Sequence, residues 1–419
     1  MFKNLFMRLL LKILFLLQIL PCTLAQQRDL EYFVNQAISN SPLLKDFQNQ
    51  IQANQIDSMR IQAGFGPQVN VVSNNYYSPI FNGWGQDEVI TNIANVSALA
   101  AVSKEIVGNK NKNNQYWIVR LQSMALLNSS KISEQDLKKN VTEQYIITFG
   151  FWQQTQYSSE VLTLLQQEEQ ILKKLTEQGT YKQVDYLSFL VSIQQQKLQL
   201  AQENSKYRDN YALLNYLCGI NDTAYFHLVE PQLSISDLPE LNNSVLYQQF
   251  VIDSLKNAAN DKQIDFQYKP KINLFSDAGY NSSLVYKPIR NFGVTIGLNF
   301  TMPIYDGKQR KMQHNKIAIA EQTRINYRDF FTKQYNQQVY RLFDQLRANN
   351  NLAQITEKQI TFSKTLIDAN HKLLETGDIH ITDYIIAIGN YLNAKNTMTQ
   401  NLVDKNLIVN QINYLNRKK

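Results

Sequence analysis

Cysteine and proline are both scarce in this chain of 419 residues, which has 2 cysteines and 9 prolines. Cys22 lies within a leader-like segment at the start of the chain, so Cys218 has no partner for a disulfide in the remaining residues. Residues 109–219 and 304–419 contain no proline at all. Because proline interrupts helices and sheets, both segments are free to form long, unbroken helices. Side-chain packing rather than cross-linking must therefore stabilise the fold.

Long apolar stretches are missing after residue 25, which excludes a membrane-spanning helix there. The chain begins with MFKNLFMRLLLKILFLLQILPCTLAQQ, in which basic residues precede an apolar run over residues 13–20 that leads to Ala25. This order is typical of a secretory signal peptide, cleaved after Ala25. Pro21 precedes Cys22 where lipidation signals of this kind carry a small residue, which argues against acylation of Cys22. We therefore expect an exported protein.

A strong excess of one charge and a recognisable reaction centre are absent as well. Without the leader the chain has 39 Lys and Arg against 35 Asp and Glu, a net charge of +4, which does not favour nucleic acid as a partner. None of the four histidines lies at metal-ligand spacing from another histidine or a cysteine. The sequence also lacks a nucleophile turn and a phosphate-binding glycine loop. We therefore predict that the protein is not an enzyme and has no catalytic, cofactor-binding or metal-binding residues.

Strict alternation marks one strand, in NFGVTIGLNFTMPIYDG at residues 291–307. The apolar members are Phe292, Val294, Ile296, Leu298, Phe300 and Met302. Polar residues or glycines separate them, which predicts a strand with one apolar and one polar face. In an exported protein this pattern fits a strand of an outer-membrane barrel with the six side chains facing lipid, but it also fits a strand of a soluble sandwich.

The chain contains an internal duplication. Four pairs of segments resemble each other in the same order: 40–43 and 243–246, 67–71 and 270–274, 178–187 and 376–385, and 215–217 and 413–415. We therefore divide the chain into a signal peptide at residues 1–25, a first repeat at 26–219, a linker at 220–242 and a second repeat at 243–419.

Each repeat is predicted to contain a helix, two strands, one very long helix, a turn and a further helix. The helices are expected at about 29–64, 108–177 and 182–218, and at about 243–268, 308–375 and 381–416. The strands are expected at about 67–79, 90–106, 271–285 and 291–304. At 1.5 Å per residue the long helix of the first repeat reaches roughly 105 Å, against roughly 110 Å for its two shorter helices laid end to end. In the second repeat the corresponding lengths are roughly 102 and 95 Å. The predicted class is an α+β membrane protein.

Four strands cannot close a barrel, and an open edge in lipid leaves backbone groups without partners. The strands must therefore pair with those of other copies, and three copies supply twelve strands, enough to enclose a passage. Aromatic residues suited to the two membrane interfaces are Tyr76, Tyr77, Phe81, Trp84, Tyr280 and Tyr286.

The motifs, taken together with their duplication, resemble the TolC family of outer-membrane efflux proteins. They are NSPLL at residues 40–44, GPQV at 66–69, MPIYDGK at 302–308 and a Gly-x5-Asp turn in each repeat. The resemblance implies a homotrimer with a twelve-stranded barrel in the outer membrane of a Gram-negative bacterium and a helical tunnel in the periplasm. It also implies two partners, a periplasmic adaptor (membrane fusion) protein and an inner-membrane pump. The channel would then be the passive exit duct of a tripartite efflux or type I secretion system.

The two Gly-x5-Asp turns carry the candidate aperture residues. These are Gly179, Lys182 and Asp185 in the first repeat, and Gly377, His380 and Asp383 in the second. The resemblance places both turns at the periplasmic tip, where the helices converge to a constriction. Relatives often have Ser or Thr at the fourth position of the motif, where it caps the next helix. Lys182 and His380 weaken that cap and put in doubt an aperture mechanism copied from relatives.

Two roles remain open for Asp185 and Asp383. Either acid can stabilise the positive end of its own helix, an effect of about 0.3–1 kcal/mol. Copies of one or both can also ring the closed tip and select cations. His380 can then act as a pH switch beside that ring, or simply be solvated.

A surface adhesin or a periplasmic spacer built on a trimeric coiled coil is the alternative function. It shares the export signal and the long helices, and differs in that its strands would form a small soluble head. The sequence does not separate drugs, metals and proteins as exported substrates, because the pump selects the cargo.

Overall fold

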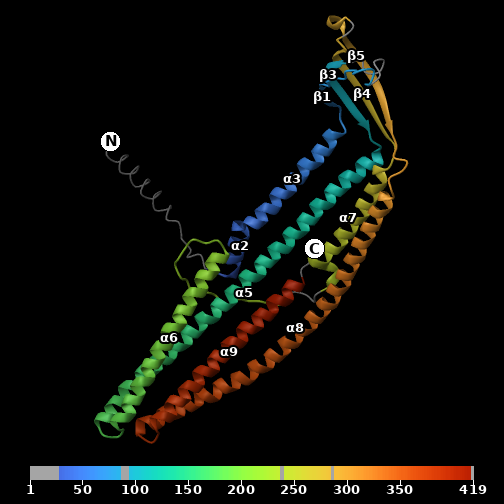
Figure 1. Cartoon of the computed structure of the whole chain (residues 1–419). Helices are drawn as coiled ribbons and strands as arrows, with labels where there is room; N and C mark the ends of the chain where they lie inside the picture. Colours follow the sequence, from blue (N-terminus) through green and yellow to red (C-terminus); the bar gives the residue numbers. More distant parts are fainter. Residues whose placement is uncertain (1–27, 86–93, 236–239, 285–286, 417–419) are drawn as a thin grey trace, which may run out of the picture. The chain divides into compact units, whose positions relative to one another are not determined.

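The computed structural model describes residues 28–85, 94–235, 240–284 and 287–416. The predicted signal peptide, Cys22 and Tyr286 lie outside these ranges, as do the first residues of the strand expected at 90–106. Figure 1 shows the elements in chain order. They form two compact units, and each unit takes segments from both sequence repeats.

We name the units by their content. The helical unit consists of the described residues within Met1–Ser41, Asp136–Ser236 and Arg341–Tyr414. The sheet unit consists of Pro42–Gln135, Asp237–Tyr340 and Leu415–Lys419.

Helices account for most of the described chain. They are α2 (Leu30–Asn40), α3 (Pro42–Gly64), α5 (Asn109–Glu177), α6 (Gln183–Leu217), α7 (Val245–Gln267), α8 (Gln309–Thr376) and α9 (Ile381–Leu415), with short 3-10 turns η1 (Leu241–Asn243) and η2 (Pro288–Arg290). The proline-free segments indeed form the longest helices, α5 with 69 residues and α8 with 68. Within the described residues, no helix combines the length and the apolar character that crossing a bilayer requires.

The single helix expected at about 29–64 is wrong, because the structure has two helices there. Asp29 caps α2 by accepting a hydrogen bond from the Tyr32 N–H (2.9 Å), and α2 ends at Asn40. Ser41 is extended, with φ −62° and ψ 115°. A residue before proline is driven out of the helical region, and Pro42 can only restart a helix at its first position.

Strands β1 (Gln68–Val72), β2 (Tyr76–Tyr77), β3 (Ala94–Ile106), β4 (Lys271–Ser282) and β5 (Phe292–Thr301) form one antiparallel sheet. Its order is β1-β3-β4-β5, and β2 continues the pairing of β1 with β3. Ser97 of β3 makes hydrogen bonds to the residues between β1 and β2. Its hydroxyl accepts from the Asn74 N–H (2.9 Å), and its carbonyl accepts from the Ser73 hydroxyl (2.7 Å). β1 and β2 together therefore act as one interrupted strand.

The helical unit has its own apolar core. One cluster gathers Phe33 of α2, Tyr145 and Phe149 of α5, and Tyr211 of α6. A second cluster joins both repeats through Leu172, Phe189, Leu374 and Tyr384. The residues that the apolar spacing places along the first long helix, such as Val141 and Leu165, are buried in these clusters.

Residues 220–235 of the predicted linker have neither helix nor strand but are firmly attached to the helical unit, and η1 begins within the linker at Leu241. Leu228 is buried in the first cluster. The Tyr145 hydroxyl donates to the Val229 carbonyl (2.8 Å) and accepts from the Val229 N–H (3.1 Å). Packing against α5 thus fixes the path of this segment.

Candidate functional site

The sheet has one continuous apolar face, which is a consequence of the strand register. Leu298 of β5 lies opposite Leu274 of β4, and Phe300 lies opposite Ile272. Opposite residues in an antiparallel pair point to the same side, so even-numbered residues of β3, β4 and β5 share a face. We call this the apolar face: Val69, Val71, Ala98, Ala100, Val102, Ile106, Ile272, Leu274, Ala278, Tyr280, Phe292, Val294, Ile296, Leu298 and Phe300, with Met302 just beyond β5.

No other described part of the chain covers the apolar face. Ile296 is 83% exposed, Phe292 75% and Phe300 61%. Exposed apolar surface of this extent marks contact with another protein or with lipid.

The opposite face of the sheet is mainly polar. Its members include Asn70, Ser103, Glu105, Asn273, Asp277, Asn281, Thr295, Asn299 and Thr301, together with Gly293 and Gly297. Phe275 is an aromatic exception, and it lies over Gly297, where an added Cβ would be 2.2 Å from the Phe275 ring. Glycine is needed there because the ring occupies the space of a side chain.

The sheet is open at β1 and β5, whose outer edges pair with no other strand in the described chain. All neighbouring pairs are antiparallel, so β1 and β5 run in opposite directions. β5 of one copy can therefore add β1 of another copy in the same antiparallel sense. The geometry allows the sheet to close into a barrel through repetition of the chain.

Aromatic side chains gather at the end of the sheet that is farther from the helices. Tyr77 is 72% exposed and Trp84 85%, and a bridge joins Trp84 to Phe81. Tyr280 packs on Phe292 with ring centroids 5.4 Å apart. Five of the six predicted interface aromatics therefore lie in described residues, and Tyr76 and Tyr77 pair with the start of β3.

The first predicted turn ends α5 and starts α6. Gly179 has φ +80°, which a residue with a Cβ adopts only with strain, and its N–H donates to the Thr176 carbonyl (3.0 Å). The Asp185 carboxylate accepts from the Lys182 N–H (3.2 Å). A lysine side chain offers no acceptor in return, so this is half of a capping box.

The second predicted turn ends α8 and starts α9. Gly377 has φ +79°, and its N–H donates to the Leu374 carbonyl (3.2 Å). Asp383 donates its N–H to the His380 carbonyl (3.0 Å), but its carboxylate makes no cap within the part of the chain that the structure describes. His380 and Asp383 are both exposed.

The two turns contact each other in the helical unit. The Tyr181 hydroxyl donates to the Ile379 carbonyl (3.1 Å), and Thr180 lies so near Gly377 that an added Cβ would be 2.5 Å from its methyl group. Burial raises the pKa of Tyr181, so its hydroxyl stays a donor at neutral pH. Among the predicted aperture residues, Gly377 lies directly against the other turn.

A buried polar cluster near the turns was not among the predicted site residues. Glu168 of α5 is 3% exposed, and its carboxylate lies 2.8 Å from Nδ1 of His371 on α8. Burial, followed by the nearby Glu168 carboxylate, raises the pKa of Tyr384 on α9. Glu168 is three residues after Leu165 and four before Leu172, so it lies on the same helix face as these apolar residues. An acid on that apolar face was the sequence feature that could have predicted the cluster.

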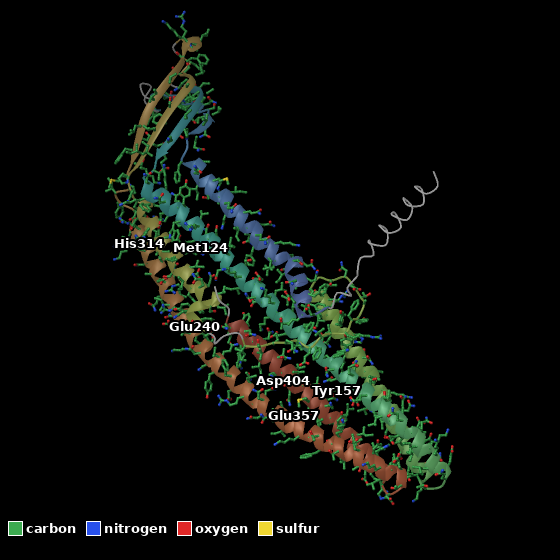
Figure 2. The ribbon with its side chains drawn as sticks, turned by 180° about the vertical axis from the view of Figure 1, so that it is seen from behind. Met124, Tyr157, Glu240, His314, Glu357 and Asp404 are labelled. Atoms are coloured by element: carbon green, nitrogen blue, oxygen red, sulfur yellow. The ribbon has the colours of Figure 1, made fainter. Side chains whose placement is uncertain are left out.

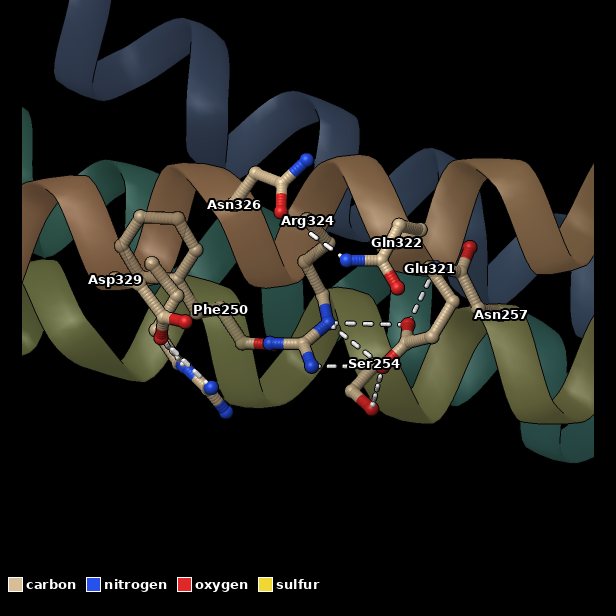
Figure 3. Close-up of polar contacts among 9 residues, drawn as sticks. Phe250, Ser254, Asn257, Glu321, Gln322, Arg324, Asn326 and Asp329 are labelled. Carbon is tan, nitrogen blue, oxygen red and sulfur yellow. Dashed lines mark hydrogen bonds and ion pairs between the residues drawn. The ribbon is translucent and has the colours of Figure 1, made fainter.

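A second polar network joins α7 and α8 in the sheet unit. The Glu321 carboxylate accepts from Arg324 (2.7 Å), Asn257 (2.9 Å) and Ser254 (3.0 Å), as Figure 3 shows. These bonds, with Arg324 first, lower the pKa of Glu321 to about 2. The network therefore keeps Glu321 ionised and fastens one helix to the other.

His314 lies on α8 near the sheet (Figure 2). Its Nδ1 is 2.6 Å from Asp261 and its Nε2 is 3.2 Å from Asp265, both on α7. The hydrogen bond to Asp261 raises the pKa of His314. Across residues 28–416, apart from the three undescribed gaps, no three His, Cys, Asp or Glu side chains are arranged to hold a metal ion.

Known proteins share this geometry. No protein-family model matches the sequence, and no curated protein matches it. Solved structures match over most of the chain, and each is a distant relative in sequence. VceC, an outer membrane protein from Vibrio cholerae, shares 12% identity at a TM-score of 0.73, and the match covers 93% of this chain and 96% of VceC.

Two further solved structures have a similar fold. The CmeC outer membrane channel of Campylobacter jejuni shares 13% identity at a TM-score of 0.72, over 92% of this chain and 85% of CmeC. CusC, whose structures concern folding and transmembrane channel formation, shares 14% identity at a TM-score of 0.74, over 93% of this chain and 92% of CusC. The predicted combination of long helices and a few strands is confirmed, and the chain has the fold of the TolC family of outer-membrane channels.

Proposed function

We propose that this chain is an outer-membrane channel that serves as the passive exit duct of a tripartite efflux or type I secretion system. The observation that carries the proposal is the sheet, whose uncovered apolar face is bounded by two unpaired edges. Lipid covers such a face without further protein, and the edges require other copies of the chain.

Three copies make the assembly. Each copy contributes β3, β4, β5 and the interrupted strand β1–β2, so a trimer has twelve strands around a water-filled passage. The polar face lines that passage and the apolar face contacts outer-membrane lipid. The long helices extend the duct into the periplasm, where a membrane fusion adaptor and an inner-membrane pump deliver the cargo.

The two turns form the inner end of the duct. Asp185 is engaged in capping its own helix, whereas Asp383 is exposed and makes no such cap within the described chain. Asp383 is therefore the acid that lines the closed end and favours cations, with His380 beside it. Lipid-facing residues are those of the apolar face, from Phe292 to Met302 on and after β5.

Membrane fractionation and bilayer recording test the proposal. The exported chain should appear in the outer membrane as an oligomer with heat-modifiable mobility, and the purified oligomer should conduct ions in a planar bilayer. Asp383→Asn should reduce cation selectivity more than Asp185→Asn. A trimer that is soluble without detergent would contradict the proposal and favour the coiled-coil spacer or adhesin instead.

A further inference from the structure

Basic residues are concentrated where the sheet joins the long helices. The connecting segments 104–112, 268–271 and 302–312 contain eight Lys or Arg and two acids, Glu105 and Asp306. At the other end of the sheet, the described segments 73–85 and 287–291 contain two basic residues and no acid. The positive charge is therefore a property of one end of the sheet.

The two acids at this end, Asp306 and Glu105, do not pair with the lysines. The Asp306 carboxylate accepts from the N–H groups of Lys308 (2.9 Å) and Arg310 (2.7 Å). Arg310 in turn pairs with Asp265 (2.6 Å). Glu105 lies on the polar face of the sheet, because odd-numbered residues of β3 point there. The remaining lysines thus have no acidic partner on their own side.

Four exposed lysines form what we call the basic collar: Lys104, Lys110, Lys308 and Lys311. None of them makes an ion pair within the described residues. Asp306 already caps the N-terminus of α8, whereas the first turn of α5 contains no acid, although acids are normally favoured at a helix N-terminus. Lys110 lies in that turn of α5 and repels the helix dipole, so an anion from outside the chain would relieve an unfavourable arrangement there.

Lys104 connects the collar to the apolar face. It pairs with Leu274 and so points to the apolar side, two residues before β3 ends at Ile106. A lysine in this place can lay its methylene chain on the apolar surface and reach outward with its ammonium group. Just past β5, Ile304 is 95% exposed and Tyr305 86%. Apolar, aromatic and then basic residues succeed one another, as expected at the boundary between acyl chains and headgroups.

We propose that the basic collar binds the phosphate groups of anionic phospholipids in the leaflet nearer the helices. The inference rests on the proposed function, because it requires the sheet to span a membrane. The positive charge of the lysines is complementary to the negative charge of the lipid phosphates, and the collar lies at the depth in the membrane where those phosphates begin. The collar thereby fixes the depth of the channel in the membrane.

Lipid retention by the purified oligomer tests this proposal. The oligomer is equilibrated in detergent with equal amounts of phosphatidylglycerol and phosphatidylcholine, and bound lipid is counted by native mass spectrometry. We expect preferential retention of phosphatidylglycerol that weakens in roughly 0.5 M salt. The combined variant Lys104→Gln, Lys308→Gln, Lys311→Gln should lose the preference, by on the order of fivefold for each lysine.

Controls separate the possible causes. Lys358→Gln, Lys364→Gln and Lys372→Gln together remove three exposed lysines of α8 in the helical unit and should leave retention unchanged. Arginine in place of Lys104, Lys308 and Lys311, three of the four collar positions, should keep the preference, which covers the case in which the glutamine variant fails to assemble. Unchanged retention in the glutamine variant, equal retention of both lipids by the parent, or displacement of lipid by millimolar inorganic phosphate would each overturn the proposal.

Normal conductance with no lipid preference would refute the collar alone, whereas an oligomer that neither inserts nor conducts would refute the proposed function as well.

Discussion

The two units of this chain use the same kind of residue in opposite ways. In the helical unit, Leu172 and Tyr384 have no exposed surface, because helices of both repeats cover them. In the sheet unit, Ile296 is 83% exposed and Phe300 61%. Apolar periodicity thus identifies an apolar face in each unit, but within the described residues only the helical unit covers its own. The sheet leaves its apolar face exposed and its two outer edges unpaired within the described residues.

The largest expected effect lies in the helical unit. Leu172→Ala removes a fully buried side chain from the cluster that joins the two repeats, and we expect the free energy of unfolding to fall by about 3–5 kcal/mol. Leu198→Ala is the matched control, since Leu198 on α6 is 53% exposed. Denaturant titration followed by helical circular dichroism measures both. Equal effects of the two variants would contradict a self-sufficient helical core.

A charge on the apolar face should have a smaller effect that depends on lipid. Ile296→Arg places a guanidinium in the middle of β5, which we expect to cost about 2–4 kcal/mol in a bilayer. Thr295→Arg, one residue earlier on the polar face, should cost little. Folding into lipid vesicles, scored by heat-modifiable mobility, distinguishes them. A larger defect from Thr295→Arg would mean that the two faces are assigned the wrong way round.

The two turn glycines offer a comparison within the helical unit. Alanine at either position adopts a left-handed backbone, at a cost of about 1–2 kcal/mol. Gly377→Ala should cost more than Gly179→Ala, because its Cβ would also meet Thr180, whereas nothing lies within 4 Å of the Cβ at Gly179. Proteolysis at the turns and the unfolding midpoint report the difference. Identical behaviour would argue against close contact between the turns.

The smallest expected effect is the pH dependence of the α7–α8 network. The folded-state pKa of Glu321 is lowered from 4.5 to about 2, so its contribution to stability is present above pH 4.5 and is lost as the pH falls toward 2. Glu321→Gln should flatten the stability profile in that window. His314 should act with the opposite sign, because its raised pKa gives a contribution that is present below pH 6.5 and lost as the pH rises through the raised value. Unfolding midpoints of the parent, Glu321→Gln and His314→Gln, measured from acidic to mildly alkaline pH, check both assignments, and parallel profiles for parent and variants would refute them.

Local patterns predicted much of the fold. Alternation predicted β5 and its apolar face, and proline-free periodic segments predicted α5 and α8. The break before Pro42 had a visible signal, since the residue before a proline avoids the helical region, but helical periodicity on both sides of it hid the interruption.

Other features depend on contacts between distant segments. The Glu168–His371 pair joins α5 to α8, and no spacing rule connects positions so far apart in the chain. Tyr181 reaches the second turn only because the two helix pairs end together. Lys104 points to the apolar side because of its pairing with β4, and the alanines of β3 obscure that alternation in the sequence. Pairing and packing, rather than composition, decide these parts of the candidate site.

Cross-linking between the sheet edges tests most directly whether several copies close one barrel. In a Cys218→Ala background, Val69→Cys on β1 is combined in turn with Val294→Cys, Ile296→Cys, Leu298→Cys or Phe300→Cys on β5, all on the apolar face. Oxidation in outer-membrane preparations should give covalent dimers and trimers for one pairing register, and the trimer should be the largest product. A chain that stays monomeric in every combination, with its edges unlinked, would contradict a barrel shared between copies.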